Sequence, residues 1–135
     1  MVESIPSSSN LIALCDNKIL LLKRARPNSA EFRKWGLVGG GIEEGEDSEK
    51  AVHREVMEEI GCEIKWLKLF KEYKGFFKEK KVHAMYYFGE VQGTIKLNDE
   101  HSEYVWFSFE EIKDLDVAFN QKEILMEFIK RGVLK

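Results

Sequence analysis

Three glutamates in the middle of the chain have the types and spacing that could bind a metal ion. Glu55, Glu58 and Glu59 stand at positions i, i+3 and i+4, so on a helix their carboxylates project from one face. Like charges at this spacing repel one another at neutral pH. One interpretation is an ordinary solvated helix face, because glutamate is a good helix former. The other is a site for hard divalent cations, since Mg²⁺ prefers carboxylate oxygens.

The residues around these glutamates form a longer pattern at fixed spacing. A run of glycines, Gly39–Gly41, leads into it, and the helical segment closes on Gly61. The stretch resembles the Nudix box in its motif positions, which are Gly40, Glu46, Arg54, Glu55, Glu58, Glu59 and Gly61. The one departure is the last position, where an aliphatic residue is usual and this chain has Cys62, which packs as a small hydrophobe.

The resemblance to Nudix hydrolases, in particular to the MutT-type branch, implies a role for each part of the box. Such enzymes cleave a nucleoside diphosphate linked to a further group X, using Mg²⁺, for which Mn²⁺ can substitute. By resemblance, Glu58 and Glu59 are the principal metal ligands, and Glu55 is a ligand or the base. Arg54 orients the glutamates, with a plain surface ion pair as the alternative. Gly39 belongs to the metal site through its backbone, which a glycine allows to approach closely.

A catalytic base is also expected outside the box, in the acidic segment Asp99–Glu103. MutT-type members carry an additional glutamate ahead of a tryptophan, here Trp106, and both Glu100 and Glu103 match positions found in members. We favour Glu100 over Glu103, with a solvated acidic loop as the alternative for either. The histidines show no ligand pattern and are expected at surface or core positions: His53, His83 and His101.

Residues elsewhere in the chain are candidates for binding the substrate. Arg24 follows the apolar run Leu20–Leu22, where the MutT-type branch places an arginine near the phosphates, and Arg26 is the second candidate. Asn120 falls near a base-reading asparagine of that branch, and an amide can pair bidentately with a purine edge. We favour the alternative that Asn120 caps the last helix. Val38 replaces the proline usual in this branch, which argues against a narrow substrate such as oxidised guanine.

Together these residues predict a Mg²⁺-dependent hydrolase that converts ribo- or deoxyribonucleoside triphosphates to a monophosphate and pyrophosphate. A nucleotide-sugar hydrolase is the alternative, because the box leaves X open. A third hypothesis is a non-catalytic domain that binds a nucleotide and regulates a partner. Such domains tend to have lost box glutamates, and this chain keeps all of them.

Composition limits the fold and the partners. The 135 residues suit a single domain, 1–135, with a loose segment at 1–10. A formal charge of −3 gives no bulk electrostatic reason to bind nucleic acid or anionic membranes. Cys15 and Cys62 lack metal-ligand spacing, and without a secretion signal both are expected to be reduced and buried in a cytoplasmic protein. The sequence leaves the oligomeric state open, with a homodimer among the options.

Hydrophobic patterning predicts the elements that must position these residues. Leu11–Cys15 and Ile19–Leu22 flank the turn Asp16-Asn17 and predict a hairpin, followed by a loop over Lys23–Lys34. The box helix is expected from about Asp47 to Ile60, with Asp47 or Ser48 as its N-cap and Gly61 at its end.

The remaining pattern predicts further strands, loops and helices. Strands are expected over Trp35–Val38, Glu63–Tyr73, Val82–Val91 (buried on both faces) and Tyr104–Phe107. A hairpin tip is expected over Lys74–Lys81 and a loop over Leu97–Glu103. Helices are expected over Phe109–Leu115 and Gln121–Arg131. Strands mixed with two substantial helices predict an α/β domain. The family resemblance implies the Nudix α/β/α sandwich around a mixed β-sheet.

Overall fold

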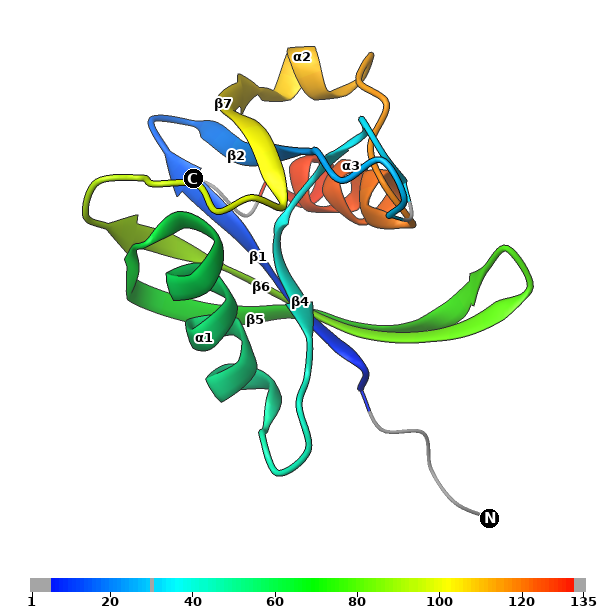
Figure 1. Cartoon of the computed structure of the whole chain (residues 1–135). Coiled ribbons are helices and arrows are strands. Elements are labelled where there is room, and N and C mark those ends of the chain that lie inside the picture. The colour runs from blue at the N-terminus through cyan, green and yellow to red at the C-terminus, as the bar shows by residue number, and fades with distance from the viewer. Residues whose placement is uncertain (1–5, 30, 133–135) are drawn as a thin grey trace.

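A computed structural model of the chain describes residues 6–29 and 31–132 (Figure 1). Its elements in chain order are β1 (Ser8–Cys15), β2 (Lys18–Arg24), β3 (Trp35–Gly36), β4 (Val38–Gly41), α1 (Ser48–Ile60), β5 (Glu63–Phe77), β6 (Lys80–Gln92), β7 (His101–Ser108), α2 (Phe109–Ile112) and α3 (Gln121–Arg131). None of the described helices is long and apolar enough to cross a membrane.

Strand β1 is the centre of a mixed seven-stranded sheet. It pairs in parallel with β6 and antiparallel with β2 and β4, while β7 pairs with β2. Leu11 and Ala13 of β1 pack into the apolar cluster on one face, and Ile12 and Leu14 pack into the cluster on the other. Because both faces are covered, β1 has a continuous apolar run in place of alternation.

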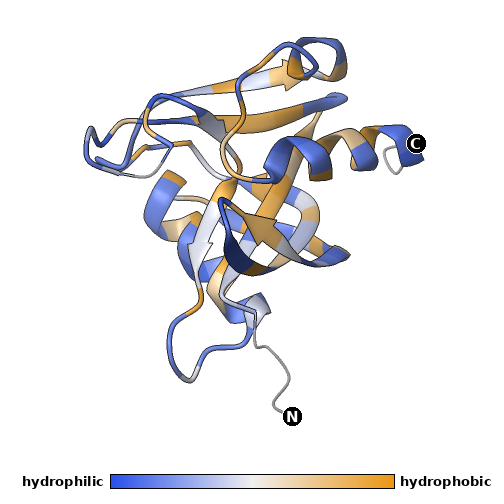
Figure 2. Ribbon diagram, turned by 90° about the vertical axis from the view of Figure 1, so that its right-hand side faces the viewer, coloured by the Kyte–Doolittle hydropathy of each residue, from blue (hydrophilic) through white to orange (hydrophobic). Residues whose placement is uncertain are grey.

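Helices cover the two faces of the sheet. Val52, Val56 and Ile60 of α1 pack in the same cluster as Leu11, whereas α3 packs into the opposite cluster through residues such as Phe128. Figure 1 shows α1 and α3 on opposite sides of the sheet, and Figure 2 shows the apolar residues concentrated on the strands between hydrophilic loops. The structure therefore has the predicted α/β/α arrangement.

Helix α1 begins and ends as its sequence predicts. Of the two candidate caps, Asp47 is the N-cap, and its side chain accepts a hydrogen bond of 2.8 Å from the Lys50 N–H. Gly61 has a left-handed φ of 67°, and its N–H donates to the Met57 carbonyl. A glycine adopts this conformation without the strain that a Cβ would add. The box helix is thus defined by residues within its own segment.

The expected loose segment 1–10 is wrong for its last three residues, which belong to β1. Ser9 and Asn10 are buried although they are polar. The Ser9 hydroxyl donates to the Ser48 carbonyl at 2.8 Å, and the Asn10 amide donates to the Met85 carbonyl at 3.3 Å. These partners, distant in sequence, allow polar residues to be buried in a central strand. Residues 1–5 lie outside the described residues.

The expected hairpin tip at Lys74–Lys81 is also wrong in its extent. Strand β5 continues to Phe77 and β6 begins at Lys80, so the turn is only Lys78-Glu79, both with left-handed φ. Figure 1 shows the two strands projecting beyond the body of the sheet as a long hairpin. The charged residues of this two-stranded ribbon face solvent. Its sequence is therefore as polar as that of a loop, which is why the pattern predicted one.

Several strand ends differ from the patterning because they depend on pairing. The expected strand Trp35–Val38 is two short strands, β3 and β4, on either side of Leu37. Strand β2 continues into the expected loop as far as Arg24, and β7 begins at His101, not at Tyr104. Helix α2 is shorter than expected. Backbone pairing of β2 with β7, including Arg24 opposite His101, extends both strands through polar residues.

The predicted burial of β6 on both faces is confirmed. Tyr86 packs in the cluster beneath α3 and Tyr87 in the cluster beneath α1. The predicted hairpin with its Asp16-Asn17 turn is present as β1 and β2, with left-handed φ at both turn residues. Helix α3 also has its predicted bounds and ends on Gly132 with a φ of 63°. Cys62 is buried as predicted, but the predicted burial of Cys15 is wrong, because Cys15 is the exposed last residue of β1, next to the turn.

Replacement of Asp47 by alanine tests the cap of α1. The variant should lose about 1 kcal/mol of unfolding free energy, because the Lys50 N–H loses its side-chain partner. Urea denaturation followed by circular dichroism measures the change. Glu44→Ala, at an exposed position in the preceding loop, is the control and should change stability by less than about 0.5 kcal/mol. Equal losses in the two variants would contradict the capping role.

Candidate active site

Two glycines of strand β4 lie against their neighbours with no room for a side chain. Gly39 has a φ of 148°, and a Cβ there would lie 2.4 Å from the carbonyl oxygen of Ser9 on β1. A Cβ on Gly40 would lie 2.7 Å from the carboxyl carbon of Glu55 on α1. Gly39 therefore permits the close pairing of β4 with β1, and Gly40 leaves the space that the Glu55 carboxyl fills beside the strand.

Glu59 is the most deeply buried of the three box glutamates, with 4% of its surface exposed. The Gly39 N–H donates to its Oε1 at 2.9 Å. Burial, with the nearby carboxylates of Glu55 and Glu100, raises the pKa of Glu59 to about 9 in spite of that hydrogen bond. A carboxylate in this position ionises at neutral pH when a cation compensates its charge.

Glu55 and Glu58 share the helix face but differ in burial. The Glu55 side chain is 12% exposed, and burial raises its pKa, against the opposing effect of Arg54. The Glu58 side chain is 53% exposed. Nη1 of Arg54 donates to Glu55 at 2.9 Å and to Glu58 at 3.1 Å. The predicted shared face is therefore present, with Glu58 at its solvent edge.

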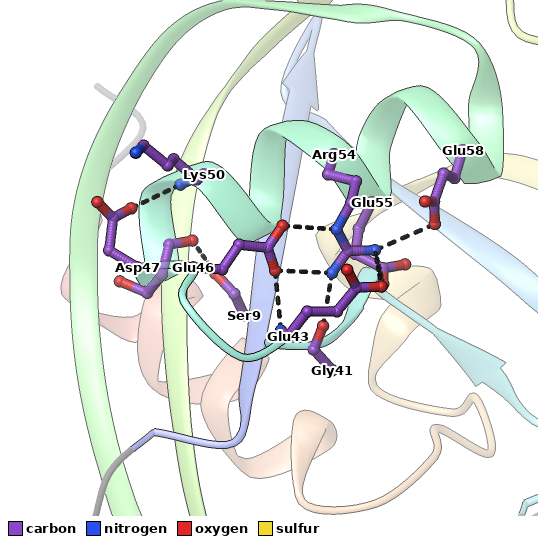
Figure 3. A network of polar contacts seen from close by, with 10 residues as sticks. Ser9, Gly41, Glu43, Glu46, Asp47, Lys50, Arg54, Glu55 and Glu58 are labelled. Carbon is purple, nitrogen blue, oxygen red and sulfur yellow. Dashed lines mark hydrogen bonds and ion pairs between the residues drawn. The ribbon is translucent and has the colours of Figure 1, made fainter.

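Arg54 is the centre of a polar network that joins α1 to the loop before it (Figure 3). Its Nε and Nη2 donate to the two carboxylate oxygens of Glu46 at 2.6 and 2.9 Å. Nη2 also donates to the Gly41 carbonyl at 2.8 Å. The hydrogen bond from Arg54 lowers the pKa of Glu46 to about 2. These contacts go beyond a surface pair with Glu58 and agree with an orienting role for Arg54.

A cavity of about 230 Å³ opens beside the buried glutamates, and we call it the acidic cavity. Glu55, Glu59 and Glu100 line it, together with the backbone of Gly39–Gly41. Glu58 is not among its lining residues. A cavity with three carboxylates and a glycine backbone has the donor set and the space for a hydrated divalent cation.

The structure separates the two candidates for the base. Glu100 lines the acidic cavity, and its carboxylate lies with ligand atoms of Glu59 and His101, all within 4.8 Å of one another. Glu103 lies on β7, is 55% exposed and pairs with Lys23 on β2 at 3.6 Å. Glu103 therefore faces a neighbouring strand, outside the cavity.

His101 is a member of this cluster that the sequence pattern did not reveal. Of the predicted surface or core positions, His101 has a buried one, with an exposure of 7%, and its Nδ1 has no hydrogen-bond partner within the described part of the chain. Burial, followed by the charge of Arg24, lowers the pKa of His101 to about 4, so the imidazole is neutral at pH 7. The one available sequence signal was its position directly after Glu100.

The two candidate arginines lie at the acidic cavity, which both of them line. Nη2 of Arg26 donates to Asp99 at 2.8 Å, and Nη1 lies 3.7 Å from the Glu100 carboxylate. The Arg24 guanidinium lies over the Phe119 ring, 5.1 Å from its centroid. Arg24 also lines a second cavity, so it stands between the two.

The second cavity, of about 280 Å³, is here called the aromatic cavity. Its walls include Phe77, Phe119 and Tyr86. The rings of Phe77 and Phe119 lie 5.5 Å apart, edge to face. The aromatic and acidic cavities share Arg24 and Gly39–Gly41, so they are adjacent. An apolar, aromatic space beside a charged one suits a ligand with a flat ring at one end and charge at the other.

Asn120 lines the aromatic cavity but does not cap α3 as predicted. It occupies the N-cap position, yet its side chain makes no cap hydrogen bond. Its Nδ2 donates to the Tyr73 hydroxyl at 2.7 Å and to the Phe76 carbonyl at 3.0 Å. Because both amide hydrogens are used, only Oδ1 remains for a ligand. Bidentate pairing with a purine edge is not available in this arrangement.

Comparison with known proteins agrees with this architecture. A family model of the NUDIX domain matches residues 6–128, so the chain belongs to the Nudix family. It is 29% identical to nucleoside triphosphatase NudI of Escherichia coli over 76% of this chain and 83% of that protein. It is 31% identical to an RNA pyrophosphohydrolase of Campylobacter jejuni over 96% of this chain and 88% of that protein.

Solved structures agree as well. The MutT protein from Methanosarcina mazei Go1 superposes with a TM-score of 0.82 at 27% identity, covering 98% of this chain and 99% of that one. A MutT NUDIX hydrolase from Burkholderia pseudomallei gives 0.77 at 26% identity, covering 93% and 98%. The predicted family, α/β fold and enzyme class are confirmed. The chain is a hydrolase of acid anhydrides that acts on nucleoside diphosphate derivatives.

The raised pKa of Glu59 predicts how stability depends on pH. A carboxyl group whose pKa is higher in the folded state than in the unfolded state stabilises the fold relative to its ionised form. For Glu59 this contribution to the free energy of unfolding is fully present below pH 4.5 and is lost as the pH rises towards 9. Without divalent cations, Glu59→Gln should therefore be more stable than the parent at pH 8, by at least about 1 kcal/mol. The difference should vanish near pH 4.5.

Urea denaturation in EDTA across this pH range measures the effect. Glu58→Gln is the matched control, because Glu58 is exposed and makes no contact with Gly39. An equal pH dependence in the two variants would refute the assignment of the effect to the buried carboxylate.

Proposed function

We propose that this hydrolase converts nucleoside triphosphates to a nucleoside monophosphate and pyrophosphate with the help of Mg²⁺, for which Mn²⁺ can substitute. The observation that carries the proposal is the meeting of two different cavities at Arg24 and Gly39–Gly41. The acidic cavity suits a polyphosphate with its cations, and the aromatic cavity suits a nucleoside. A nucleotide has the same two chemistries joined end to end.

The residues of the acidic cavity fit a divalent cation. Glu59 is buried with a raised pKa, and Nδ1 of His101 lacks a partner among the described residues. Glu55 and Glu59 would hold a cation inside the cavity, with the Gly39 N–H fixing the Glu59 carboxylate, and Glu58 would reach it only from the solvent edge of the same helix face. When bound, such a cation neutralises phosphate charge and lowers the pKa of a coordinated water.

The chain's own groups would carry the remaining steps. Glu100 accepts a proton from the attacking water, whose oxygen forms the new bond to phosphorus as the bridging bond of the diphosphate breaks. Arg24 and Arg26 bind the phosphate oxygens and favour the charged leaving group. Arg54 acts on the glutamates, because its guanidinium holds Glu55 and Glu58 from one nitrogen.

The nucleoside would lie in the aromatic cavity. Its base packs on the rings of Phe77 and Phe119, since stacking on aromatic rings is favourable for every base. Oδ1 of Asn120 accepts a hydrogen bond from an amino or imino group of the base. A cavity of about 280 Å³ has room for a base.

Other substrates share the same scissile bond. A relative named nucleoside triphosphatase supports the proposed substrates, while a relative named RNA pyrophosphohydrolase favours the triphosphate end of an RNA as a second candidate. The net charge of −3 offers little general attraction to a long polyanion. A nucleotide sugar remains the alternative among small molecules, and a purely regulatory domain would show binding without turnover.

A substrate panel tests the proposal. Purified protein is incubated with ribo- and deoxyribonucleoside triphosphates, nucleotide sugars and a 5′-triphosphorylated RNA oligonucleotide, each with Mg²⁺ and with Mn²⁺. We expect the highest kcat/KM for a nucleoside triphosphate, with monophosphate and pyrophosphate as products by chromatography. Preferred cleavage of the RNA or a sugar nucleotide, or no turnover at all, would reject the proposal.

The role of Glu100 is tested against Glu103. Glu100→Gln should lower kcat by about 10²-fold or more, because the carboxylate that accepts the proton is lost. Glu103→Gln should stay within about twofold, since it removes only a half-exposed pair with Lys23. Steady-state kinetics on the best substrate of the panel measures both. Similar losses in the two variants would remove Glu100 from the proposed mechanism.

A further inference from the structure

Glu31 is a buried carboxylate in the loop between β2 and β3 that lines neither cavity. Its side chain is only 5% exposed. Oε1 accepts a hydrogen bond of 3.0 Å from the Phe119 N–H, and Oε2 lies 3.1 Å from Lys34 Nζ and 3.8 Å from Lys78 Nζ. One side chain thus ties together its own loop, the turn of the β5–β6 hairpin and the segment before α3.

Both ends of the Glu31–Phe119 contact have an unusual backbone. Glu31 has a φ of 59° and Phe119 a φ of 54°, in the left-handed region that bulky residues rarely adopt. Such strain persists only when surrounding contacts hold it in place. The hydrogen bond from the Phe119 N–H to Glu31 is a contact of this kind, because it acts directly on the strained peptide.

The Phe119 backbone determines the position of its ring. The ring packs against Phe77 at 5.5 Å, and the Arg24 guanidinium lies over it at 5.1 Å. All three side chains line the aromatic cavity, whereas Glu31 does not. If the Phe119 peptide relaxed to an ordinary conformation, its ring would leave this arrangement and the cavity would lose a wall.

Stability alone is a poor reason for burying Glu31. Its lysine partners are 33% and 73% exposed, and ion pairs that reach solvent contribute little to stability. Burial raises the pKa of Glu31, but the Phe119 N–H and Lys34 outweigh it and leave the pKa below its ordinary value, so the group is ionised. A charged acceptor makes a stronger hydrogen bond to the Phe119 N–H than a neutral one.

We propose that Glu31 is a positioning residue that holds the Phe77–Phe119 wall in place to bind a nucleobase. Through it the chain distinguishes nucleotides from phosphates that lack a base. The inference rests on the proposed function in one respect, which is that the aromatic cavity receives the nucleoside. It adds a specificity determinant that touches neither the phosphates nor the scissile bond.

Binding without turnover provides the test. Titration calorimetry measures the dissociation constants of AMP, GMP, CMP and UMP, with ribose 5-phosphate as the base-free probe. Glu31→Ala should weaken the nucleotide that binds best by about tenfold, as expected when a hydrogen bond to a charged group is lost. The same variant should leave the affinity for ribose 5-phosphate unchanged. Equal weakening of nucleotide and ribose 5-phosphate would overturn the proposal.

Two controls separate positioning from a general loss of structure. Asp116→Ala removes a 77% exposed carboxylate that also approaches Lys34 but does not contact Phe119, and it should change neither affinity. Glu31→Gln keeps an oxygen that can accept from the Phe119 N–H, and it should show a smaller loss than Glu31→Ala. If circular dichroism shows that Glu31→Ala does not fold, the glutamine variant decides the test. An unchanged nucleotide affinity in Glu31→Gln would then overturn the proposal.

A double-mutant cycle with Phe119→Ala identifies the route of the effect. If Glu31 acts through the Phe119 ring, adding Glu31→Ala to Phe119→Ala should cause no further loss of nucleotide affinity. Additive losses would overturn the proposal. None of these titrations requires hydrolysis. Glu31-dependent nucleotide binding without triphosphate turnover would reject the proposed function and support this inference.

Discussion

A carboxylate buried against a glycine backbone is the constraint on which the rest of the site depends. The Gly39 N–H donates to Glu59, and the space at Gly40 is filled by the Glu55 carboxyl. Gly39 permits the close pairing of β4 with β1, Gly40 leaves room for the Glu55 carboxyl, and the apolar contacts of α1 with the sheet hold the helix beside the strand. Burial of carboxylates is costly without a countercharge. A buried carboxylate of this kind favours a cation beside it.

Rigid and adaptable parts of the molecule have different tasks. The sheet and α1 hold the acidic cluster, and Arg54 locks the preceding loop to the helix through Glu46 and Gly41. The aromatic cavity adds residues from outside the box, among them those of the β5–β6 hairpin and the segment before α3, to the glycines Gly39–Gly41. The acidic cluster is therefore part of the rigid scaffold, while the proposed nucleoside site also draws on the hairpin and the segment before α3. This division lets related enzymes share a reaction and differ in substrate.

The local charge of the site differs from the average of the chain. The chain as a whole has a net charge of −3. The acidic cavity, in contrast, holds Arg24 and Arg26 beside three carboxylates. Opposite charges kept close together bind a phosphate and its cation at once, which a uniformly basic or acidic surface would not do. The same principle applies at a smaller scale to Glu31, whose charge is held by Lys34 and Lys78 and directed at a single peptide N–H.

The sequence by itself determined what depends on neighbours along the chain. Helical spacing places Glu55, Glu58 and Glu59 on one face, and Asp47 and Gly61 bound α1, because caps and i, i+4 contacts are local. Tertiary structure decided the rest. It chose Glu100 over Glu103 for the cavity, brought His101 to Glu59, and turned the Asn120 amide towards Tyr73. Each outcome depends on strand pairing or burial between residues far apart in sequence, which no local pattern encodes.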